Sequence, residues 1–353
     1  MNAPMSIGPT LRLADLSDRE EIARIEAFVA QSGGSVFHRP LWLAAIERGT
    51  GQKAYGLLCE KAGVIRGWLP LTDVHSPLFG RALVSSGFAV GGGVLAEDDA
   101  AIASLCDAAS ELALRLGAAT VELRSAAAPA GWEVIEGRHA GFEAPLAGDD
   151  EPQLFAIPRK ARAEVRKGLA GDLEISIGSG AKELAEHYAC YAESVRNLGT
   201  PVFPRSLFAA VIDAFGEDAD ILTVRSGGQP VASVLSLYHG GAVLPFWGGG
   251  SHAARGLRAN ERMYFELMCH ARRKGMTRFD FGRSKTGSGP YNFKKNWGFE
   301  PQPLIYRLWS AVGTDARNID PTDEGYSAKI ELWKKLPLPL ANAIGPWIAR
   351  GLG

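Results

Sequence analysis

"VFPRSLFAAVI", residues 202–212, repeats an earlier part of the chain and decides the fold. It lies without a gap over "VFHRPLWLAAI", residues 36–46, and the two share Val, Phe, Arg, Leu, Ala and Ile at the same places. Further along, "LGAATVELRS" (116–125) matches "KGMTRFDFGRS" (274–284) after one inserted residue, and "GFE" follows both. Because such matches recur in one order, the sequence predicts two copies of a single domain.

Both copies are expected to have the same order of elements. A helix leads into a hairpin, which turns at Ala62-Gly63 in one copy and at Gly227-Gly228 in the other. A glycine-flanked strand, a long helix, a strand, a short helix or loop and a last strand follow. This order predicts an α+β fold in which each copy has a mixed, mainly antiparallel sheet flanked by helices. The long helices are expected at 99–116 and 259–274, and the strands after them at 119–123 and 277–281.

The composition and the spacing of certain residues exclude several classes of protein. A chain of 353 residues with a formal net charge of −1 suits about two globular domains, and not a protein that coats DNA. The amino-terminal segment lacks the basic and apolar regions of a signal peptide, and no stretch reaches the roughly 18 apolar residues that span a membrane. The 4 cysteines stand far apart and the 7 histidines have no metal-ligand spacing. We therefore expect a cytoplasmic protein without a metal site.

Three motifs carry a resemblance to a known family. They are "FDFGRS" (279–284), "YNFKKNWGFEPQP" (291–303) and the tail "WKKLPLPLANAIGPWIARGLG" (333–353). With the duplication, they resemble the FemAB family, which has two tandem GNAT-like domains, and most of all its subgroup associated with exosortase (PEP-CTERM) loci. We accordingly expect a first GNAT-like domain at 1–148, a scaffold or acceptor wall, and a second at 149–310 with the active site. An amphipathic tail follows at 311–353.

The resemblance also implies an activity. Members of the family transfer an acyl or aminoacyl group to an amine of a cell-envelope precursor, here an amino sugar of an exopolysaccharide or a lipid-linked glycan. The donor is acyl-CoA or aminoacyl-tRNA, used as a co-substrate, and no cofactor is tightly bound. No Ser-His-Asp set can be read in the chain, which favours direct transfer over a covalent enzyme intermediate. The alternative is a non-catalytic duplicated module that binds glycan or a partner protein.

Lys294 and Tyr291 are the first candidates for catalysis. Lys294 stands where FemAB-like enzymes keep a lysine near the transfer centre, and its ammonium could stabilise an oxyanion or neutralise a donor phosphate. Alternatively, its stem covers aromatic residues and its amine lies in water, as is expected for Lys295. Tyr291 could give a proton to the leaving oxygen or sulfur, as a tyrosine does in many GNAT enzymes, or it could be a core aromatic.

Asp280 is the third catalytic candidate. It alternates with two phenylalanines, so its carboxylate faces away from them and could act as a general base if burial raised its pKa. It could equally pair with the nearby Arg283. The following loop, 284–289, is rich in glycine and serine, and Ser284 and Lys285 could contact a substrate over which it closes. A plain flexible connector is the other interpretation.

Two basic segments and one aromatic residue are candidates for holding the substrate or donor. On a helix over 159–167, three arginines share a face that suits the phosphates of tRNA, CoA, a nucleotide-sugar or a lipid carrier, or that simply meets solvent. After the glycines of the second copy come two further arginines and an asparagine, whereas the first copy has three acidic residues there. The usual GNAT pyrophosphate loop is not intact. These candidates are Trp247, Arg255, Arg258, Asn260, Arg159, Arg162 and Arg166.

The tail joins tryptophans and aliphatic residues with a few cations. Three prolines in 337–346 preclude one long helix. Two placements stay open for this segment: packing on the first domain, or peripheral contact with the inner face of the membrane, where lipid-linked glycans are made.

Overall fold

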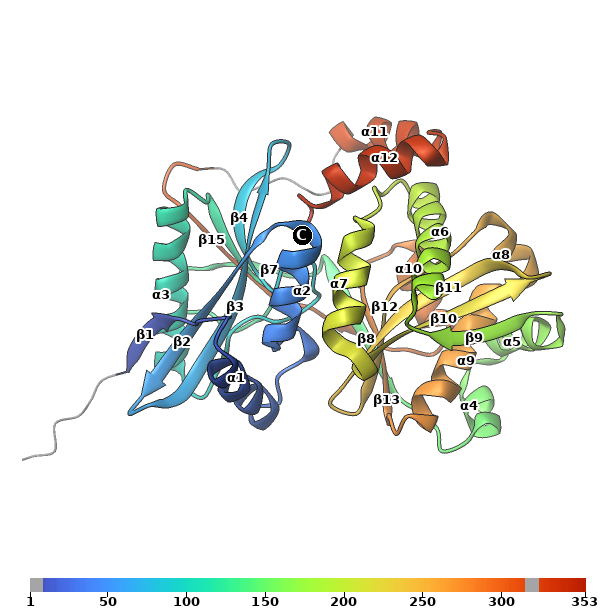
Figure 1. The fold of residues 1–353 in the computed structure, drawn as a ribbon, viewed down its shortest axis with the longest axis horizontal. Helices are drawn as coiled ribbons and strands as arrows, with labels where there is room; N and C mark the ends of the chain where they lie inside the picture. The colour runs from blue at the N-terminus through green and yellow to red at the C-terminus, as the bar shows by residue number, and fades with distance from the viewer. Residues whose placement is uncertain (1–8, 315–323) are drawn as a thin grey trace, which may run out of the picture. The chain divides into compact units, whose positions relative to one another are not determined.

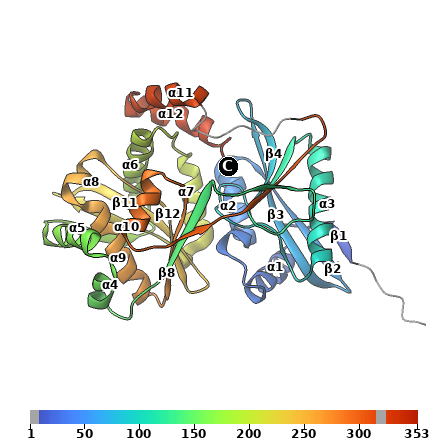
Figure 2. The same ribbon diagram turned by 180° about the vertical axis from the view of Figure 1, so that it is seen from behind.

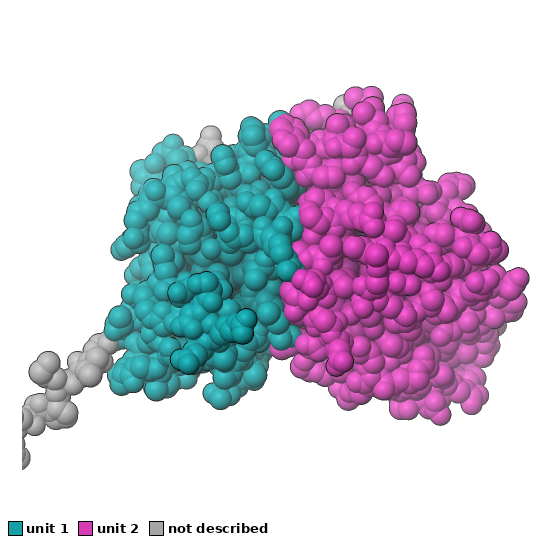
Figure 3. Space-filling view, in the orientation of Figure 1, with its two compact units in different colours: residues 1–136, 305–319, 350–353 teal, residues 137–304, 320–349 magenta. Residues whose placement is uncertain are grey.

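The computed structural model describes residues 9–314 and 324–353. The chain divides into two compact units. One comprises residues 1–136, 305–319 and 350–353, and the other comprises residues 137–304 and 320–349 (Figure 3). Each unit contains one mixed sheet with helices on its faces (Figure 1). The α+β class and the tandem arrangement that the sequence predicts are confirmed.

The first unit is built on an eight-stranded sheet in which β5 pairs with β3 beside the main path. Helix α3 covers one face, where Leu69 and Leu105 meet in the core, and α1 and α2 cover the other, where Trp68 packs on Ile25 and Leu43. Successive residues of a strand point to opposite faces, which is why neighbouring Trp68 and Leu69 serve different cores. In sheet order the strands are β1 (Thr10–Leu13), β2 (Lys53–Lys61), β3 (Val64–Ser76), β4 (Gly80–Ser85), β6 (Thr120–Leu123), β15 (Tyr306–Ser310) and β7 (Glu133–Ile135), with β5 at Leu95–Ala96. The helices are α1 (Arg19–Gln31), the short 3₁₀ helix η1 (Val36–His38), α2 (Pro40–Thr50) and α3 (Asp99–Leu116).

The second unit has a seven-stranded sheet and more helices. Residues of α9, among them Met263 and Leu267, pack on Val243 and Phe279 of the sheet to form an extended buried cluster. In sheet order the strands are β14 (Pro301–Pro303), β8 (His139–Pro145), β13 (Arg278–Lys285), β12 (Ala242–Gly250), β11 (Gln229–His239), β10 (Ala219–Ser226) and β9 (Glu174–Gly178). The helices are α4 (Asp150–Ala156), α5 (Arg159–Ala170), α6 (Ala181–Leu198), α7 (Arg205–Phe215), η2 (Gly216–Asp218), α8 (His252–Leu257), α9 (Ala259–Arg273), α10 (Gly289–Asn296), α11 (Glu324–Lys334) and α12 (Leu338–Ala349).

The two halves of the chain exchange their last strands. β8 follows the first copy in sequence but lies in the second sheet, antiparallel to β13 and β14. β15 follows the second copy but lies in the first sheet, between β6 and β7. The exchange covers sheet edges that would otherwise be open. The chain therefore passes from one compact unit to the other after residues 136 and 304, while the domain bounds 1–148 and 149–310 stay a prediction.

The C-terminal helices do not lie on the first unit. Arg196 of α6 donates from its guanidinium to the carbonyl oxygen of Lys334 at 3.0 Å, and a Cβ on Gly345 would meet the backbone of Val202 at 3.1 Å. α11 and α12 thus pack on the second unit. Of the described part of the tail, residues 311–314 and 350–353 belong to the first unit, so packing of the whole tail on that unit, one of the two placements left open, is wrong. Among the described residues, no helix is long and apolar enough to cross a membrane.

Candidate functional site

Two neighbouring strands of the second sheet separate beside the candidate residues. The parallel strands β12 and β13 pair through Ala242 with Arg278 and Val243 with Phe279, and no later pair joins them between residues 242 and 285. On its other side β13 pairs with β8, and that register shifts between Asp280 and Arg283. Gly282, with φ +68°, lies in this irregular segment. The irregularity turns backbone carbonyl groups out of the ladder, where a side chain can reach them.

Lys294 is the side chain that reaches them. It is the buried residue of α10, and its Nζ donates to the carbonyl oxygens of Gly282 at 3.2 Å and of Arg283 at 3.0 Å. The same nitrogen lies 5.4 Å from the ring centres of Phe142 and of Phe281. The alternative in which the amine lies in water is therefore wrong for Lys294, whose exposure is 8%. Lys295, one residue on, is exposed as expected.

The electrostatics of this centre are perturbed. Burial lowers the pKa of Lys294 to about 8, the Asp280 carboxylate acts in the opposite direction, and the charge of Arg283 adds to the lowering. Burial likewise raises the pKa of Asp280, against the hydrogen bond that its carboxylate accepts from the Gly282 amide at 2.9 Å. Paired perturbations of this kind concentrate at functional sites.

Asp280 does not make the ion pair with Arg283 that was the alternative for it. Within the described chain it accepts from the Gly282 amide and forms no ion pair within 4 Å. Its cross-strand neighbour is Glu143, whose charge is taken up by Arg278 at 2.6 Å. The carboxylate is thus held near Lys294 without a cation in contact.

Tyr291 and Ser284 belong to the same region. The Tyr291 ring stands edge-on to Phe142 at 5.3 Å between centres, and its amide donates to Ser288 Oγ at 3.3 Å, which caps α10. Ser284 is buried, and its Oγ has no hydrogen-bond partner among the described residues. Lys285, next along the strand, ends β13 and is partly buried. The structure therefore gathers Lys294, Tyr291, Asp280, Arg283, Ser284 and Lys285 on β13 and α10.

The other candidates lie elsewhere in the unit. Trp247 is buried and its ring packs on Phe208 of α7 at 5.0 Å, so it is a core aromatic on the other face of the sheet from α9. Asn260 lies against Gly250, and its Oδ1 is buried without a partner among the described residues. Both are therefore integral to the packing of the β12 end.

The residues of the second copy that were expected to bind a phosphate make other contacts in the structure. Arg258, in the left-handed conformation with φ +56°, forms an ion pair with Glu164 of α5 at 2.6 Å. The first amide of α8, that of His252, donates to the carboxylate of Glu193 at 2.8 Å. Arg255 is exposed. A carboxylate at this helix start occupies the place that an anionic ligand would need.

The basic run forms α5, as predicted, and two of its arginines stack on an aromatic residue of α4 that sequence reasoning missed. The guanidinium groups of Arg162 and Arg166 lie 5.0 and 5.5 Å from the ring centre of Phe155, which is 53% exposed. Arg159 is exposed beside them, and neither it nor Arg166 has an ion-pair partner in the described chain. Stacking holds Arg162 and Arg166 at the surface. Arg162 also donates to the carbonyl oxygen of Phe155 at 2.9 Å, and the other donors of its guanidinium are available for phosphate oxygens.

Phe142 and Gly282 are two positions of this candidate site that sequence reasoning missed. Phe142 forms one wall around Lys294, but its strand was assigned to the first copy. The recurrence of "GFE" in 141–143 and 298–300 was the available signal, because β14, which follows the second "GFE", pairs with β8. Gly282 appears as an ordinary strand residue until the register shift is seen.

The fold and this site define a class. Residues 158–295 match the model of an acetyltransferase (GNAT) domain, which covers most of the second unit and includes Lys294. The first unit repeats its order of elements, so the chain has a tandem GNAT fold, an arrangement that can be followed from behind in Figure 2.

Solved structures share this tandem fold at low sequence identity. FemX matches with a TM-score of 0.63 and 17% identity over 80% of this chain and 95% of its own. A tandem GNAT protein from the clavulanic acid biosynthesis pathway matches with a TM-score of 0.56 and 12% identity over 87% and 100%. The C-terminal domain of a protein named as a lysylphosphatidylglycerol synthetase, from Agrobacterium fabrum, matches with a TM-score of 0.55 and 14% identity over 84% and 93%. No curated protein matches the sequence.

Proposed function

We propose that the second unit transfers an acyl or aminoacyl group to an amine. The observation that carries this proposal is the buried Lys294, held by two carbonyl groups and two aromatic rings at the point where β12 and β13 separate. The GNAT domain match over 158–295 supports an N-acyltransferase, and the fold shared with FemX supports the tandem arrangement.

The residues suit a direct displacement. The acceptor nitrogen attacks the ester or thioester carbonyl, and the carbonyl oxygen becomes an oxyanion that the Lys294 ammonium stabilises. Asp280, whose pKa is raised by burial, takes the proton that the amine loses. Tyr291 gives its phenol proton to the leaving oxygen or sulfur as the acyl bond breaks, and it regains one from solvent. Asp280 then releases its proton to solvent, so that one amide bond forms, one ester or thioester bond breaks, and the enzyme returns to its starting state.

The substrates follow from the chemistry of the surfaces and from the resemblance. The donor is acyl-CoA or aminoacyl-tRNA, used without a tightly bound cofactor, and Arg159, Arg162 and Arg166 would hold its phosphates. The acceptor that we propose is an amino sugar of a cell-envelope or exopolysaccharide precursor, either free or lipid-linked. A role in a PEP-CTERM system, in the cytoplasm or at the inner face of the membrane, is part of the same proposal.

The tail supports peripheral contact with a membrane. Ala341, Gly345 and Ala349 are buried on one face of α12, whereas Leu340 and Trp347 are 47% and 51% exposed on the other, with Ile344 between them. α12 has no charged residue from Leu338 to Ala349, and exposed cations, Lys335 and Arg350, flank it. An uncharged helix with an exposed tryptophan and flanking cations suits the interface of an anionic bilayer.

One observation favours the rival function, a non-catalytic module that binds glycan or a partner protein. Glu193 caps the start of α8, and Arg258 pairs with Glu164, so the usual place for a donor pyrophosphate is taken. If this arrangement persists with ligand, the unit would bind no donor.

A thermal shift series separates the two functions. The purified protein is heated with acetyl-CoA, longer acyl-CoAs or aminoacyl-tRNA in parallel. A donor at 100 times its Kd stabilises the fold by about 2.7 kcal/mol, which is readily measured. Stabilisation by a CoA ester or by charged tRNA supports transfer and identifies the donor class. No shift with any donor, alone or with an amino sugar present, would favour the binding module.

A further inference from the structure

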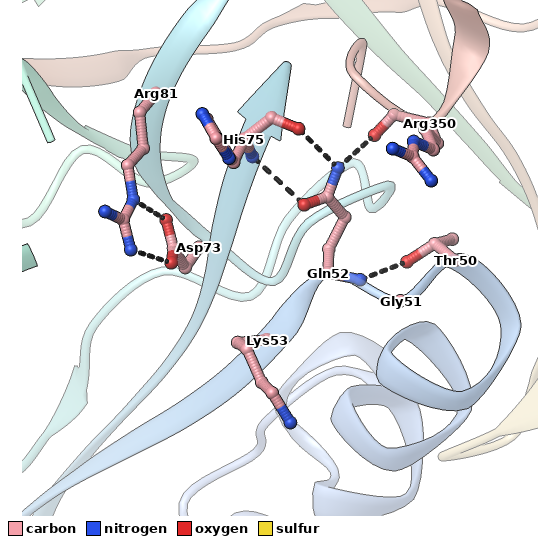
Figure 4. A pocket seen from close by; sticks show the side chains of 8 residues that line it. All are labelled: Thr50, Gly51, Gln52, Lys53, Asp73, His75, Arg81 and Arg350. Atoms are coloured by element: carbon pink, nitrogen blue, oxygen red, sulfur yellow. Dashed lines mark hydrogen bonds and ion pairs between the residues drawn. The ribbon is translucent and has the colours of Figure 1, made fainter. Parts of the chain in front are cut away.

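The first unit contains a polar cavity that the proposed transfer does not use. It has a volume of about 270 Å³ and lies where the end of α2 meets the β2, β3 and β4 strands (Figure 4). Its lining has no large apolar side chain and half of its residues are charged: Thr50, Gly51, Gln52, Lys53, Asp73, His75, Arg81 and Arg350. At about 30 Å³ for each water molecule, it could hold about nine. The cavity is therefore large enough for a small organic ligand.

The strand register explains why charged residues meet here. Lys53 of β2 lies directly opposite Asp73 of β3, and His75 of β3 lies directly opposite Arg81 of β4. Asp73 and His75 are two residues apart, so all four side chains project from one face of the sheet. An imidazole directly opposite a guanidinium has no favourable partner across the strands, which distinguishes this face from an ordinary ladder of ion pairs.

Neighbouring groups already neutralise part of this charge. Arg81 grips both oxygens of Asp73, with Nε at 2.8 Å from Oδ1 and Nη2 at 2.6 Å from Oδ2. Lys53 forms an ion pair with Glu47 at 2.6 Å. The last carbonyl groups of α2 add a partial negative charge of about half an elementary charge. These contacts neutralise both carboxylates, those of Asp73 and Glu47, and two of the cations, Arg81 and Lys53.

Two side chains are left without a partner. The imidazole of His75 and the guanidinium of Arg350 have no hydrogen bond or ion pair in the chain that the structure describes, and both residues are exposed. The backbone of both is nevertheless fixed by one buried residue. Gln52 donates to the carbonyl oxygens of His75 at 3.1 Å and of Arg350 at 2.8 Å, and it accepts from the His75 amide at 3.0 Å (Figure 4).

We propose that this cavity binds a phosphate monoester of a small polar molecule, such as a sugar phosphate. The phosphate would lie between Arg350 and His75, whose donors are free. Gln52 holds both backbone positions before the ligand arrives, so little ordering is needed on binding. The space beyond the phosphate admits a polar group of the size of a sugar. This site is independent of transfer in the second unit.

Binding is measured by calorimetry on the full chain, with inorganic phosphate, glucose 1-phosphate and glucose as probes. We expect saturable binding of glucose 1-phosphate, weaker binding of inorganic phosphate and none of glucose. Arg350→Gln removes one charge-assisted donor, which should weaken glucose 1-phosphate binding about tenfold or more. The Arg350 side chain has no partner to lose among the described residues, so this variant should fold like the wild type. A matched control, Arg115→Gln, removes an exposed arginine of α3 that does not line the cavity.

Three results would overturn the proposal. They are the absence of saturable binding of glucose 1-phosphate by the wild type, equal binding by Arg350→Gln, and an equal loss in Arg115→Gln. A second variant, His75→Asn, keeps a hydrogen-bond donor of smaller reach, and its binding should lie between those of Arg350→Gln and the wild type. Loss of donor transfer in the second unit would leave all of these results unchanged.

Discussion

The Nζ of Lys294 donates to the carbonyl oxygen of Arg283 at 3.0 Å, which joins the last turn of α10 to the irregular segment of β13. A lysine buried in this way loses much of its hydration, which costs free energy. The carbonyl groups and aromatic rings around the amine offset this cost. The contact also fixes the amine within the region where the candidate residues gather. Its removal is the simplest test of the site.

We expect Lys294→Met to abolish most transfer while leaving the fold intact. Methionine retains the apolar stem of lysine and packs against Phe142 and Phe281, but it cannot stabilise an oxyanion. Loss of one such donor lowers kcat by roughly 10²–10³. Lys295→Met is the matched control, because it removes a neighbouring exposed amine, and its kcat should stay within about twofold of wild type. Equal losses in both variants would argue against a special role for Lys294.

The stability of the protein should depend on the pH through Lys294. Its pKa is lowered from 10.5 to about 8 in the fold. Below pH 8 both folded and unfolded chains are protonated, and the full cost of the buried charge is present. Between pH 8 and 10.5 the folded chain loses the proton that the unfolded chain keeps, so wild type gains stability with rising pH relative to Lys294→Met.

Urea unfolding of both proteins at pH 7 and pH 10 measures this gain. At about 1.4 kcal/mol for each pH unit between the two pKa values, the difference in free energy of unfolding should change by about 2–3 kcal/mol in favour of wild type. Lys295→Met should show no such change. A difference that stays constant from pH 7 to pH 10 would mean that the Lys294 amine is not desolvated.

Gly282→Ala tests the backbone that holds the amine. Gly282 has φ +68°, and a Cβ there would meet no atom within 4 Å, so the cost is backbone strain of about 1–2 kcal/mol. Gly287→Ala is a matched control, since Gly287 has φ +77° and equally open surroundings. We expect similar losses of stability, but a loss of kcat only in Gly282→Ala, whose carbonyl oxygen accepts from Lys294. Similar kcat values for the two variants would show that the irregular segment of β13 has no role in catalysis.

Substitution of the arginines of α5 should weaken binding of the donor without changing the stability of the fold. Arg159→Gln and Arg166→Gln each remove a cation that has no ion-pair partner in the described chain, so thermal stability should stay near that of wild type. Each lost contact to a phosphate should raise KM for the donor about tenfold at low salt. Lys167→Gln, which removes a cation already paired with Glu164, is the control. An unchanged KM would show that the donor binds elsewhere.

The exposed face of α12 predicts binding to anionic vesicles. Full-length protein should sediment with phosphatidylglycerol vesicles at low salt and less with phosphatidylcholine vesicles. Trp347→Ser should weaken this binding without loss of stability, because the side chain is half exposed. Leu114→Ser, on an exposed position of α3, is the control. Membrane contact through α12 would be contradicted if the wild-type protein did not bind the vesicles, or if Trp347→Ser bound them as well as the wild type.

Local signals allowed much of the fold to be predicted. The helix expected at 99–116 has these bounds in the structure, because Asp98 caps its start and Gly117, with φ +69°, ends it. The exchange of β8 and β15 could not be predicted in the same way. Which edge a strand joins depends on contacts far apart in the chain, and the internal repeat favours the linear arrangement.

The site was predicted in part for similar reasons. Lys294 could be selected from the resemblance of its motif to the FemAB family, but its carbonyl partners come from a shift of register that has no local sequence signal. The pairing of Asp280 with Arg283 was expected from their closeness in the sequence, and the same shift of register falls between them. Arg258 was expected to face a phosphate, yet α5 packs beside α9 and brings Glu164 to it. That contact joins segments almost a hundred residues apart.

The most direct test of the central claim measures transfer itself. Labelled acyl-CoA or aminoacyl-tRNA is mixed with an amino sugar and with wild type, Lys294→Met or Lys295→Met, and the labelled amide is quantified over time. We expect wild type and Lys295→Met to form the amide at similar rates, and Lys294→Met to form it roughly 10²–10³ times more slowly. Equal rates from Lys294→Met and wild type, or no amide from wild type with either donor, would contradict the central claim.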